Sequence, residues 1–291
     1  MKEGKIIWMD GKFVRWKDAT IHVLTHSLHY GAAVYEGIRV YPAGIFRLDE
    51  HLDRFLHSMK EISMKSPFTK EQLKKAIFEL VKKNGIKDGY VRPIAYYGYK
   101  RLGIYWGGLP VKVAIAVMPW ASYLPAEMKM KISKWRRLNP SCVKINAKVS
   151  GYYVNSNYAT QSVKNEADEA LLLDFKGNVA EAACANIFFV KNGVVYTPKS
   201  SYILPGITRD SVIKMAKSLG FKVVEKNIKP REIFGFDEAF TTGTATEVTA
   251  VVKINNRNIG TGKMGKVTKL FREKFSSLLD GKNPKFKKWL Q

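Results

Sequence analysis

One short stretch, from Met118 to Pro125, interrupts an otherwise regular succession of strand-like and helix-like segments. It holds two prolines, and proline ends regular structure because it lacks an amide hydrogen and fixes its own φ angle. The chain of 291 residues also exceeds the usual size of one domain. We therefore expect a small N-terminal α+β domain at residues 1–118, an interdomain linker at 119–130 and a larger domain at 131–291.

Local signals place several elements in the first of these domains. Asp10-Gly11, inside the strand-like run Ile6–Val14, predicts a tight hairpin, because both residues tolerate a positive φ angle. Asp49 is a candidate N-cap for a helix that follows it. Thr69 and Gln72 form a capping box for a second helix, which should end at Asn84-Gly85. Two strands are expected at 90–99 and 111–118.

The larger domain is expected to mix strands and helices as well. Its helices are predicted between or after the strand candidates, at 152–166, at 208–219 with Gly220 as the C-terminal stop, and at 266–279. Its strand candidates are the short runs 131–135, 170–175, 187–191, 194–197, 221–226 and 238–242.

Charge gives the chain an unusual balance of 49 Lys and Arg against 25 Asp and Glu, a formal net charge of +24. A nucleic-acid-binding surface is one interpretation, and a lysine-rich solvated surface is the other. The basic residues are spread along nearly every segment and accompany no nucleic-acid motif, which favours the solvated surface. We expect no specific nucleic-acid partner, and a basic binding protein stays the alternative from another functional class.

Targeting and metal signals are not found in the sequence. The N-terminus lacks the apolar region of a signal peptide, and no apolar run reaches the ~20 residues that span a bilayer. Cys142 and Cys184 form no CxxC pair and have no His or Cys cluster at metal-ligand spacing. We expect a cytoplasmic protein with no membrane partner and no bound metal.

Three segments place small or polar residues where a core would need apolar ones. Lys148, flanked by Ala, Val and Gly in the run 146–153, could act as an imine-forming amine. The turn Leu204–Asp210 leads into a helix, whose first amides and dipole favour an anion. Thr241–Glu247 runs from a strand into a loop of hydroxyls and amides.

Each of these segments has an ordinary explanation when it is taken alone. Most lysines are solvated, and a helix cap or a turn accounts for the other two runs. Taken together, an amine and two anion-binding loops describe the site of an aldehyde cofactor that is anchored by a phosphate.

In order and spacing, these segments resemble the fold-type IV aminotransferases, and in particular the branched-chain amino acid aminotransferases. The resemblance extends over nearly the whole chain. It implies a two-domain fold, with a small α+β domain, a larger domain with a β-barrel-like core and the cofactor in the cleft between them. The other matching runs are Leu28–Gly31, Val34–Arg39, Glu50–Arg54, Tyr90–Pro93, Pro119-Trp120, Glu181 and Asn186–Phe188.

Pyridoxal 5'-phosphate is the cofactor that the resemblance implies. Lys148 would form the imine with its aldehyde, Glu181 would pair with the ring nitrogen, and Tyr153 would hydrogen-bond the ring hydroxyl. A carboxylate at the ring nitrogen keeps the ring protonated and makes it a better electron sink. The phosphate would be held by Arg54, Gly206, Ile207, Thr208, Gly243 and Thr244.

The same resemblance implies a substrate site for reversible transamination between leucine, isoleucine or valine and 2-oxoglutarate. A mostly apolar pocket would be walled by Tyr35, Tyr90, Trp120 and Tyr123, and the α-carboxylate would meet Thr244, Ala245 and Thr246. Arg92 would bind the second carboxylate of glutamate, helped by Tyr30 of a partner subunit. The partners expected are amino acids, 2-oxo acids and a second copy of the chain, in at least a homodimer, with a hexamer as the larger alternative.

Two positions depart from the family pattern. Cys184-Ala185 stands where a second glutamate is usual, and with Asn186 it is closer to aminodeoxychorismate lyases. Tyr152 replaces a common asparagine. A D-amino acid aminotransferase or aminodeoxychorismate lyase of the same fold is therefore the alternative, against which the segment Tyr90–Arg92 argues.

Overall fold

Two compact units make up the computed structural model, which describes residues 2–120 and 125–291. The first unit consists of residues 1–121, 147–151 and 279–291, and the second of residues 122–146 and 152–278. Segments 147–151 and 279–291 thus differ from the sequence-based division, which assigned them to the larger domain. The predicted limits of the linker, 119 and 130, stay predictions.

Backbone hydrogen bonds explain why these two segments belong to the first unit. The amide of Lys148 donates to Oγ of Ser58 over 2.9 Å, and the Lys148 carbonyl accepts from the amide of Tyr35 over 3.2 Å. At the end of the chain, Ile45 and Gln291 exchange backbone hydrogen bonds of 2.7 and 3.0 Å. Such long-range pairings leave no local pattern in the sequence.

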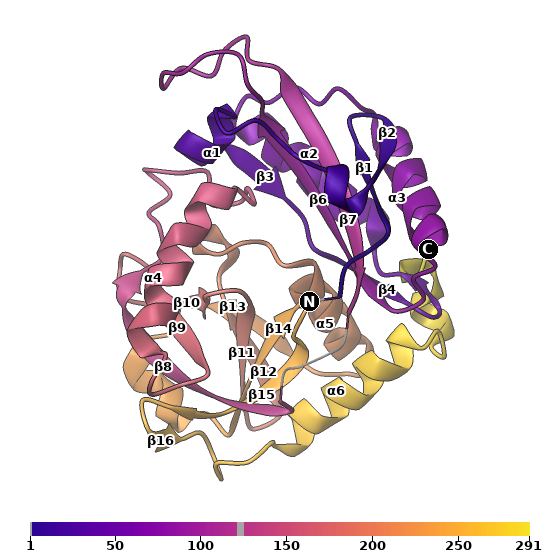
Figure 1. The fold of residues 1–291 in the computed structure, drawn as a ribbon. Coiled ribbons are helices and arrows are strands. Elements are labelled where there is room, and N and C mark those ends of the chain that lie inside the picture. Colours follow the sequence, from indigo (N-terminus) through magenta and orange to yellow (C-terminus); the bar gives the residue numbers. More distant parts are fainter. Residues whose placement is uncertain (1, 121–124) are drawn as a thin grey trace. The chain divides into compact units, whose positions relative to one another are not determined.

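An antiparallel sheet, whose strands differ in length, forms the frame of the first unit (Figure 1). Its first hairpin turns at Asp10 and Gly11, whose φ angles of 47° and 90° confirm the predicted tight turn. The strand order is β2-β1-β7-β6-β4-β5, and β3 also pairs with β6. The bounds are β1 (Ile6–Met9), β2 (Lys12–Arg15), β3 (Ala33–Tyr35), β4 (Ile38–Tyr41), β5 (Gly44–Ile45), β6 (Gly89–Tyr97) and β7 (Val111–Pro119).

Helices cover one face of this sheet. The helix α2 (Leu48–Glu61) packs against α3 (Lys70–Asn84), and α3 in turn contacts β1 and β7. The predicted capping box is confirmed, since Thr69 Oγ1 accepts from the Gln72 amide and Gln72 Oε1 accepts from the Thr69 amide. Gly85 ends α3 at a φ of 67°. A short helix, α1 (His26–Tyr30), precedes β3.

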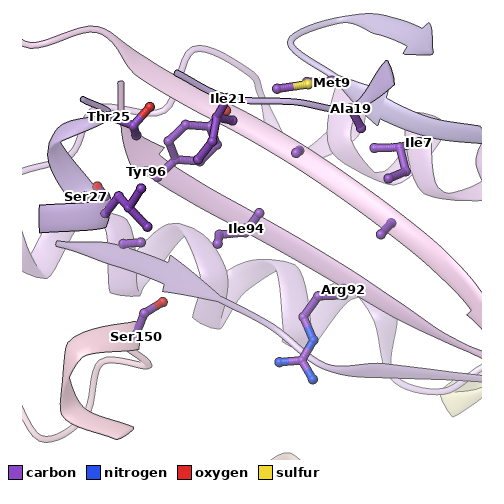
Figure 2. A pocket seen from close by; sticks show the side chains of 14 residues that line it. Ile7, Met9, Ala19, Ile21, Thr25, Ser27, Arg92, Ile94, Tyr96 and Ser150 are labelled. Atoms are coloured by element: carbon purple, nitrogen blue, oxygen red, sulfur yellow. The ribbon is translucent and has the colours of Figure 1, made fainter. Parts of the chain in front are cut away.

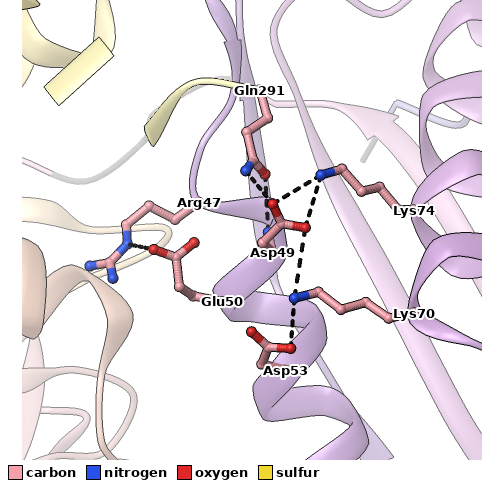
Figure 3. A network of polar contacts seen from close by, with 7 residues as sticks. All are labelled: Arg47, Asp49, Glu50, Asp53, Lys70, Lys74 and Gln291. Carbon is pink, nitrogen blue, oxygen red and sulfur yellow. Dashed lines mark hydrogen bonds and ion pairs between the residues drawn. The ribbon is translucent and has the colours of Figure 1, made fainter. Parts of the chain in front are cut away.

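The start of α2 differs from the prediction that Asp49 is its N-cap. The N-cap is Arg47, in a left-handed conformation with a φ of 48° and no capping side chain. Gln291 takes over this task, because its Oε1 accepts from the Asp49 amide over 3.1 Å (Figure 3). The Asp49 carboxylate also binds Lys74 of α3 at 2.9 Å, so distant segments fix the beginning of α2.

The opposite face of the sheet is apolar and lines a cavity of about 400 Å³ (Figure 2). Alternate residues of three adjacent strands supply its floor, because successive side chains of a strand point to opposite faces. They are Ile7 and Met9 of β1, Arg92, Ile94 and Tyr96 of β6, and Ala114 and Ala116 of β7.

In the second unit, a larger curled sheet has the order β10-β9-β8-β15-β14-β11-β12-β13, and β16 pairs with β15. Parallel pairs join β8 to β9 and to β15, and β12 to β13, while the other pairs are antiparallel. The bounds are β8 (Glu127–Arg136), β9 (Glu169–Leu173), β10 (Val179–Ala182), β11 (Asn186–Lys191), β12 (Val194–Pro198), β13 (Val223–Lys226), β14 (Glu238–Gly243), β15 (Glu247–Ile254) and β16 (Arg257–Asn258).

Two helices of the second unit pack on this sheet, and a third comes after its last strand in the sequence. The helix α4 (Tyr153–Val163) packs on β8 and β9, and α5 (Ile207–Ser218) packs on β13 and β14. The last helix, α6 (Lys266–Leu279), has the bounds that the sequence predicts. Phe188 and Phe240 stack at 4.9 Å in the core, with Phe271 of α6 edge-on to Phe240. Among the described residues, no helix has the length and apolarity needed to cross a membrane.

Candidate functional site

Lys148 is held in the first unit by its backbone on both sides. Its amide binds Ser58 of α2 and its carbonyl binds Tyr35 of β3, and the neighbouring Val34 and Val149 form an antiparallel bridge. The ammonium lies 4.6 Å from the centre of the Tyr35 ring. The predicted imine-forming lysine therefore has a fixed main chain and contacts a predicted pocket tyrosine.

Arg92 of β6 lies on the same aromatic group. Its guanidinium carbon is 4.8 Å from the centre of the Tyr35 ring and 5.1 Å from that of Tyr90, and the Tyr90 ring stacks on Trp120 at 4.5 Å. In the described part of the chain, no carboxylate forms an ion pair with Arg92. The structure thus brings together a lysine, an arginine and three aromatic rings that the sequence assigned to one site.

Arg54, the predicted phosphate ligand of α2, pairs with a carboxylate that is fully buried. Its Nε and Nη2 donate to the two oxygens of Glu36 over 2.6 and 2.9 Å. His51, one helical turn earlier on α2, lies with Nδ1 2.8 Å from Glu36 Oε2. The Gly37 amide donates to the same oxygen over 3.1 Å. Glu36 therefore fixes the side chain of Arg54 in two hydrogen bonds.

Electrostatics defines the charge states of this cluster. Burial alone would raise the pKa of Glu36, but the charge of Arg54 and the hydrogen bonds of Arg54 and His51 outweigh it and hold the pKa well below its usual range. The pKa of His51 is lowered, first by burial and then by Arg54 and Lys148, against the opposing effect of Glu36. His51 is therefore neutral near pH 7 and donates Nδ1–H to Glu36, while its buried Nε2 has no hydrogen-bond partner among the described residues.

In the second unit, Glu181 of β10 lies at the centre of another polar cluster. Its Oε1 is 2.5 Å from Nε of Arg137, and its Oε2 accepts from Nδ2 of Asn186 over 2.9 Å. The Leu204 amide lies 3.2 and 3.3 Å from the two oxygens. The predicted partner of the ring nitrogen is thus held by side chains and by the segment that leads into α5.

That segment forms a compact start to α5. Gly206 is the N-cap and provides no capping side chain, and Ile207 and Thr208 behind it are buried. A Cβ atom at Gly206 would lie 1.9 Å from Asn186 Oδ1, so only glycine fits there. The first amides and the dipole of this 12-residue helix are suited to a phosphate.

The turn between β14 and β15 adds polar groups that fit an anionic ligand. The hydroxyls of Thr242 and Thr246 are buried and have no hydrogen-bond partner among the described residues. A Cβ atom at Gly243 would lie 2.8 Å from Thr246 Oγ1, so this glycine keeps the turn open. Thr244 and Ala245 are partly exposed. Buried hydroxyls without partners are costly, and a phosphate or carboxylate would satisfy them.

Tyr153, Tyr30 and Tyr123 complete the set of predicted site residues. Tyr153 begins α4 and is partly buried. Tyr30, predicted to act in a partner subunit, is 40% exposed in the first unit, and its hydroxyl accepts from the Gly103 amide over 3.1 Å. Tyr123 lies outside the described residues.

Several contacts of the predicted residues were not expected from the sequence. Ser58 could have been noticed as a polar residue four positions after Arg54, on the buried face of α2. Asn186 belongs to a run that resembles the family, but the sequence assigns it no role in the site. Arg137 carries no sequence signal, because it is one of many basic residues and lies 44 positions from Glu181.

The chain is similar to known proteins over nearly its whole length. The family model described as amino-transferase class IV matches residues 33–254. A branched-chain-amino-acid aminotransferase of Pseudomonas aeruginosa is 40% identical over 98% of this chain and 96% of its own.

Solved structures are similar over the same length. A branched-chain amino acid aminotransferase of T.th. in complex with pyridoxamine 5'-phosphate has a TM-score of 0.97 and 42% identity, covering 100% of this chain and 99% of its own. That of Escherichia coli has a TM-score of 0.96 and 35% identity, covering 99% of each. The predicted fold-type IV is thereby confirmed, and from its matching motifs, its fold and these relatives the chain belongs to the class IV aminotransferases.

Proposed function

We propose that this enzyme transfers the amino group of leucine, isoleucine or valine to 2-oxoglutarate and runs the reverse reaction, with pyridoxal 5'-phosphate as its cofactor. One observation carries the proposal: Lys148 and Arg92 both lie over the ring of Tyr35, at 4.6 and 4.8 Å. A reactive amine and a cation for a carboxylate thus share an aromatic, apolar surface.

Each cofactor-binding residue has a chemical task. When bound, pyridoxal phosphate supplies an aldehyde that exchanges amino groups and a ring that accepts electrons from the substrate α-carbon. Lys148 would hold the cofactor and move the α-proton of the substrate, and Glu181 would accept the hydrogen bond of the ring nitrogen. Arg54, the first amides of α5 and Thr244 would bind the phosphate, and Tyr153 would bind the ring hydroxyl.

The substrate pocket must accept two kinds of side chain. Tyr35, Tyr90 and Trp120 offer apolar contact to a branched aliphatic group. A buried carboxylate without a partner is costly, and Arg92 supplies the cation that glutamate and 2-oxoglutarate need. The α-carboxylate common to all substrates binds at Thr244, Ala245 and Thr246.

A homo-oligomer is the second part of this proposal. Large apolar side chains are exposed in two segments of the first unit, 21–30 and 99–105, among them Val23 at 68%, Leu28 at 62% and Ile104 at 81%. Apolar patches of this kind are typical of protein interfaces. The dimer or hexamer, the Tyr30 contribution from a partner subunit and the cytoplasmic location stay predictions.

A panel of amino donors tests the function. Purified enzyme with pyridoxal phosphate is expected to use leucine, isoleucine and valine with 2-oxoglutarate, and to produce glutamate. Lys148→Ala should lose transamination and the colour of the covalently bound cofactor, while Lys164→Ala, at an exposed lysine after α4, should keep both. Preference for D-alanine, or release of pyruvate from aminodeoxychorismate, would favour the alternative members of the fold.

A further inference from the structure

Arg137 is a buried cation that no step of the proposed reaction uses directly. It follows β8, and its amide donates to the Leu173 carbonyl over 2.8 Å, which fixes its backbone. Its side chain is 10% exposed, and Nε lies 2.5 Å from Oε1 of Glu181, whose side chain is 7% exposed. The two charged side chains are thus largely shielded from water and in contact with each other.

The partners of Glu181 define its charge. Arg137 Nε and the Leu204 amide can only donate. Asn186 also donates, because its Nδ2 binds both Glu181 Oε2 and the Leu204 carbonyl, and a carbonyl can only accept. A proton on Glu181 would face these donors, so the group is held as a carboxylate.

The same contacts connect Glu181 to the phosphate end of the site. Leu204, which binds Glu181 through its amide and Asn186 through its carbonyl, lies two residues before Gly206, the N-cap of α5. Asn186 Oδ1 in turn lies against Gly206. The group for the ring nitrogen and the helix start for the phosphate therefore belong to one hydrogen-bonded unit.

We propose that Arg137 is a positioning residue: it holds Glu181 as an oriented carboxylate that keeps the cofactor's ring nitrogen protonated. The inference rests on the proposed function of Glu181. Arg137 Nε, Asn186 Nδ2 and the Leu204 amide together fix the direction of the Glu181 carboxylate.

Removal of the guanidinium changes this balance. A buried carboxylate without its cation either turns toward other donors or takes a proton, and both responses withdraw the acceptor from the ring nitrogen. Through Glu181, Arg137 thus affects how well the ring accepts electrons, and it does not contact the amino acid. The maximal rate should therefore change while the KM for the amino acid does not.

The test compares Arg137→Met, Arg137→Lys and Arg136→Met in the cofactor-loaded enzyme. Arg136 is the matched control, because it is the preceding residue and its side chain is exposed. The protonation of the ring is read from the ¹⁵N NMR shift of ¹⁵N-labelled pyridoxal phosphate, and kcat and KM for leucine are measured separately. Cofactor affinity and the urea midpoint of each variant accompany these measurements.

For Arg137→Met we expect a kcat lower by about tenfold or more, the range found when a supporting contact of a reactive group is lost. The KM for leucine should stay within about twofold, and the ring nitrogen should shift toward its unprotonated form. Arg137→Lys should lie between this variant and the wild type, and Arg136→Met should match the wild type.

A folded Arg137→Met enzyme with wild-type kcat and ring protonation would overturn the inference. If that variant does not fold, Arg137→Lys decides, and wild-type values for kcat and the NMR shift would then overturn it. Failure of the proposed function looks different, since the wild-type protein itself would then bind no pyridoxal phosphate or transfer no amino group.

Discussion

Each unit contains a buried Arg–Glu pair, and the two pairs differ in which member is supported. In the first unit the carboxylate supports the arginine, and in the second the arginine supports the carboxylate. In the first unit, Glu36 is fully buried, and Arg54 is the 10% exposed member of the pair. In the second unit, Arg137 supports a carboxylate, Glu181, that also binds Leu204 and Asn186. The first arrangement presents a cation and the second presents an anion.

The difference shows how a chain can offer an isolated charge inside a folded protein. An ion withdrawn from water needs a counterion, and that counterion also fixes its direction. For a phosphate the supporting group must be a carboxylate, and for a protonated ring nitrogen it must be a cation. The residue that supports the ligand-binding group therefore carries a charge of the same sign as the ligand.

The largest expected effect tests the support of Arg54. Glu36→Ala should lower the free energy of unfolding by about 3–5 kcal/mol, because it removes the buried carboxylate that binds both Nε and Nη2 of Arg54. Urea unfolding measures this loss. Asp18→Ala is the control, since Asp18 also pairs with an arginine, Arg15, but the side chains of this pair are 70% and 40% exposed, and the variant should change the free energy of unfolding far less. Equal losses would show that burial of the pair is not what matters.

Glu181→Gln tests the opposite pair through catalysis. The variant keeps the shape of the side chain but lacks its charge, so it should retain the cofactor and turn over at least about a hundredfold more slowly. Steady-state rates and cofactor absorbance measure the two properties. A rate near that of the wild type would mean that another group keeps the ring nitrogen protonated.

Arg92 sharpens the comparison, because among the described residues it is an arginine supported by rings and not by a carboxylate. Arg92→Ala should lower kcat/KM for glutamate and 2-oxoglutarate by at least about tenfold, and affect leucine much less. The two half-reactions can be followed separately by the colour of the cofactor. Equal losses for both substrates would assign Arg92 to the fold or to cofactor binding.

The smallest expected effect concerns pH. The pKa of His51 is lowered from its usual 6.5, so the unfolded chain binds a proton more readily than the folded protein as the pH falls below 6.5. His51 therefore contributes stability that is present above pH 6.5 and lost as the pH falls toward its lowered pKa. His51→Gln should flatten this loss, by up to about 1.4 kcal/mol per pH unit, in urea unfolding between pH 6.5 and 5.5.

Glu36 acts in the same direction at lower pH. Its lowered pKa gives stability that is present above its usual 4.5 and lost below it. The decline of wild-type stability below pH 4.5 should therefore persist in His51→Gln. A wild-type protein whose stability is constant from pH 6.5 to 5.5 would contradict the charge state inferred for His51.

Local chemistry made part of the fold predictable from sequence. The Asp10-Gly11 turn, the Thr69 capping box and α6 depend on neighbouring residues, and all three agree with the structure. The strand β15 was missed, although Val248–Ile254 is rich in valine and isoleucine, because the polar turn before it drew the interpretation toward a loop.

Site residues were predictable where they belong to a motif. Residues that only contact and position a motif residue were not predictable. Lys148, Arg92 and Tyr35 follow from the family resemblance, and the structure brings them together. The contact of Arg137 with Glu181 depends on how β8, β9 and β10 lie side by side in the sheet, which no local pattern encodes. The same holds for Ser58 and Lys148, which are 90 positions apart.

The pairing of Gln291 with the start of α2 has a consequence for the order of folding. Asp49 and Gln291 are 242 positions apart, so the helix that carries Arg54 receives its cap only after those further residues have been synthesised. The second unit consists of residues 122–146 and 152–278, so all of it precedes Gln291 in the sequence. A contact between residues this far apart forms slowly, because a long loop must close before it is made. We therefore expect the start of α2 to become fixed late in folding.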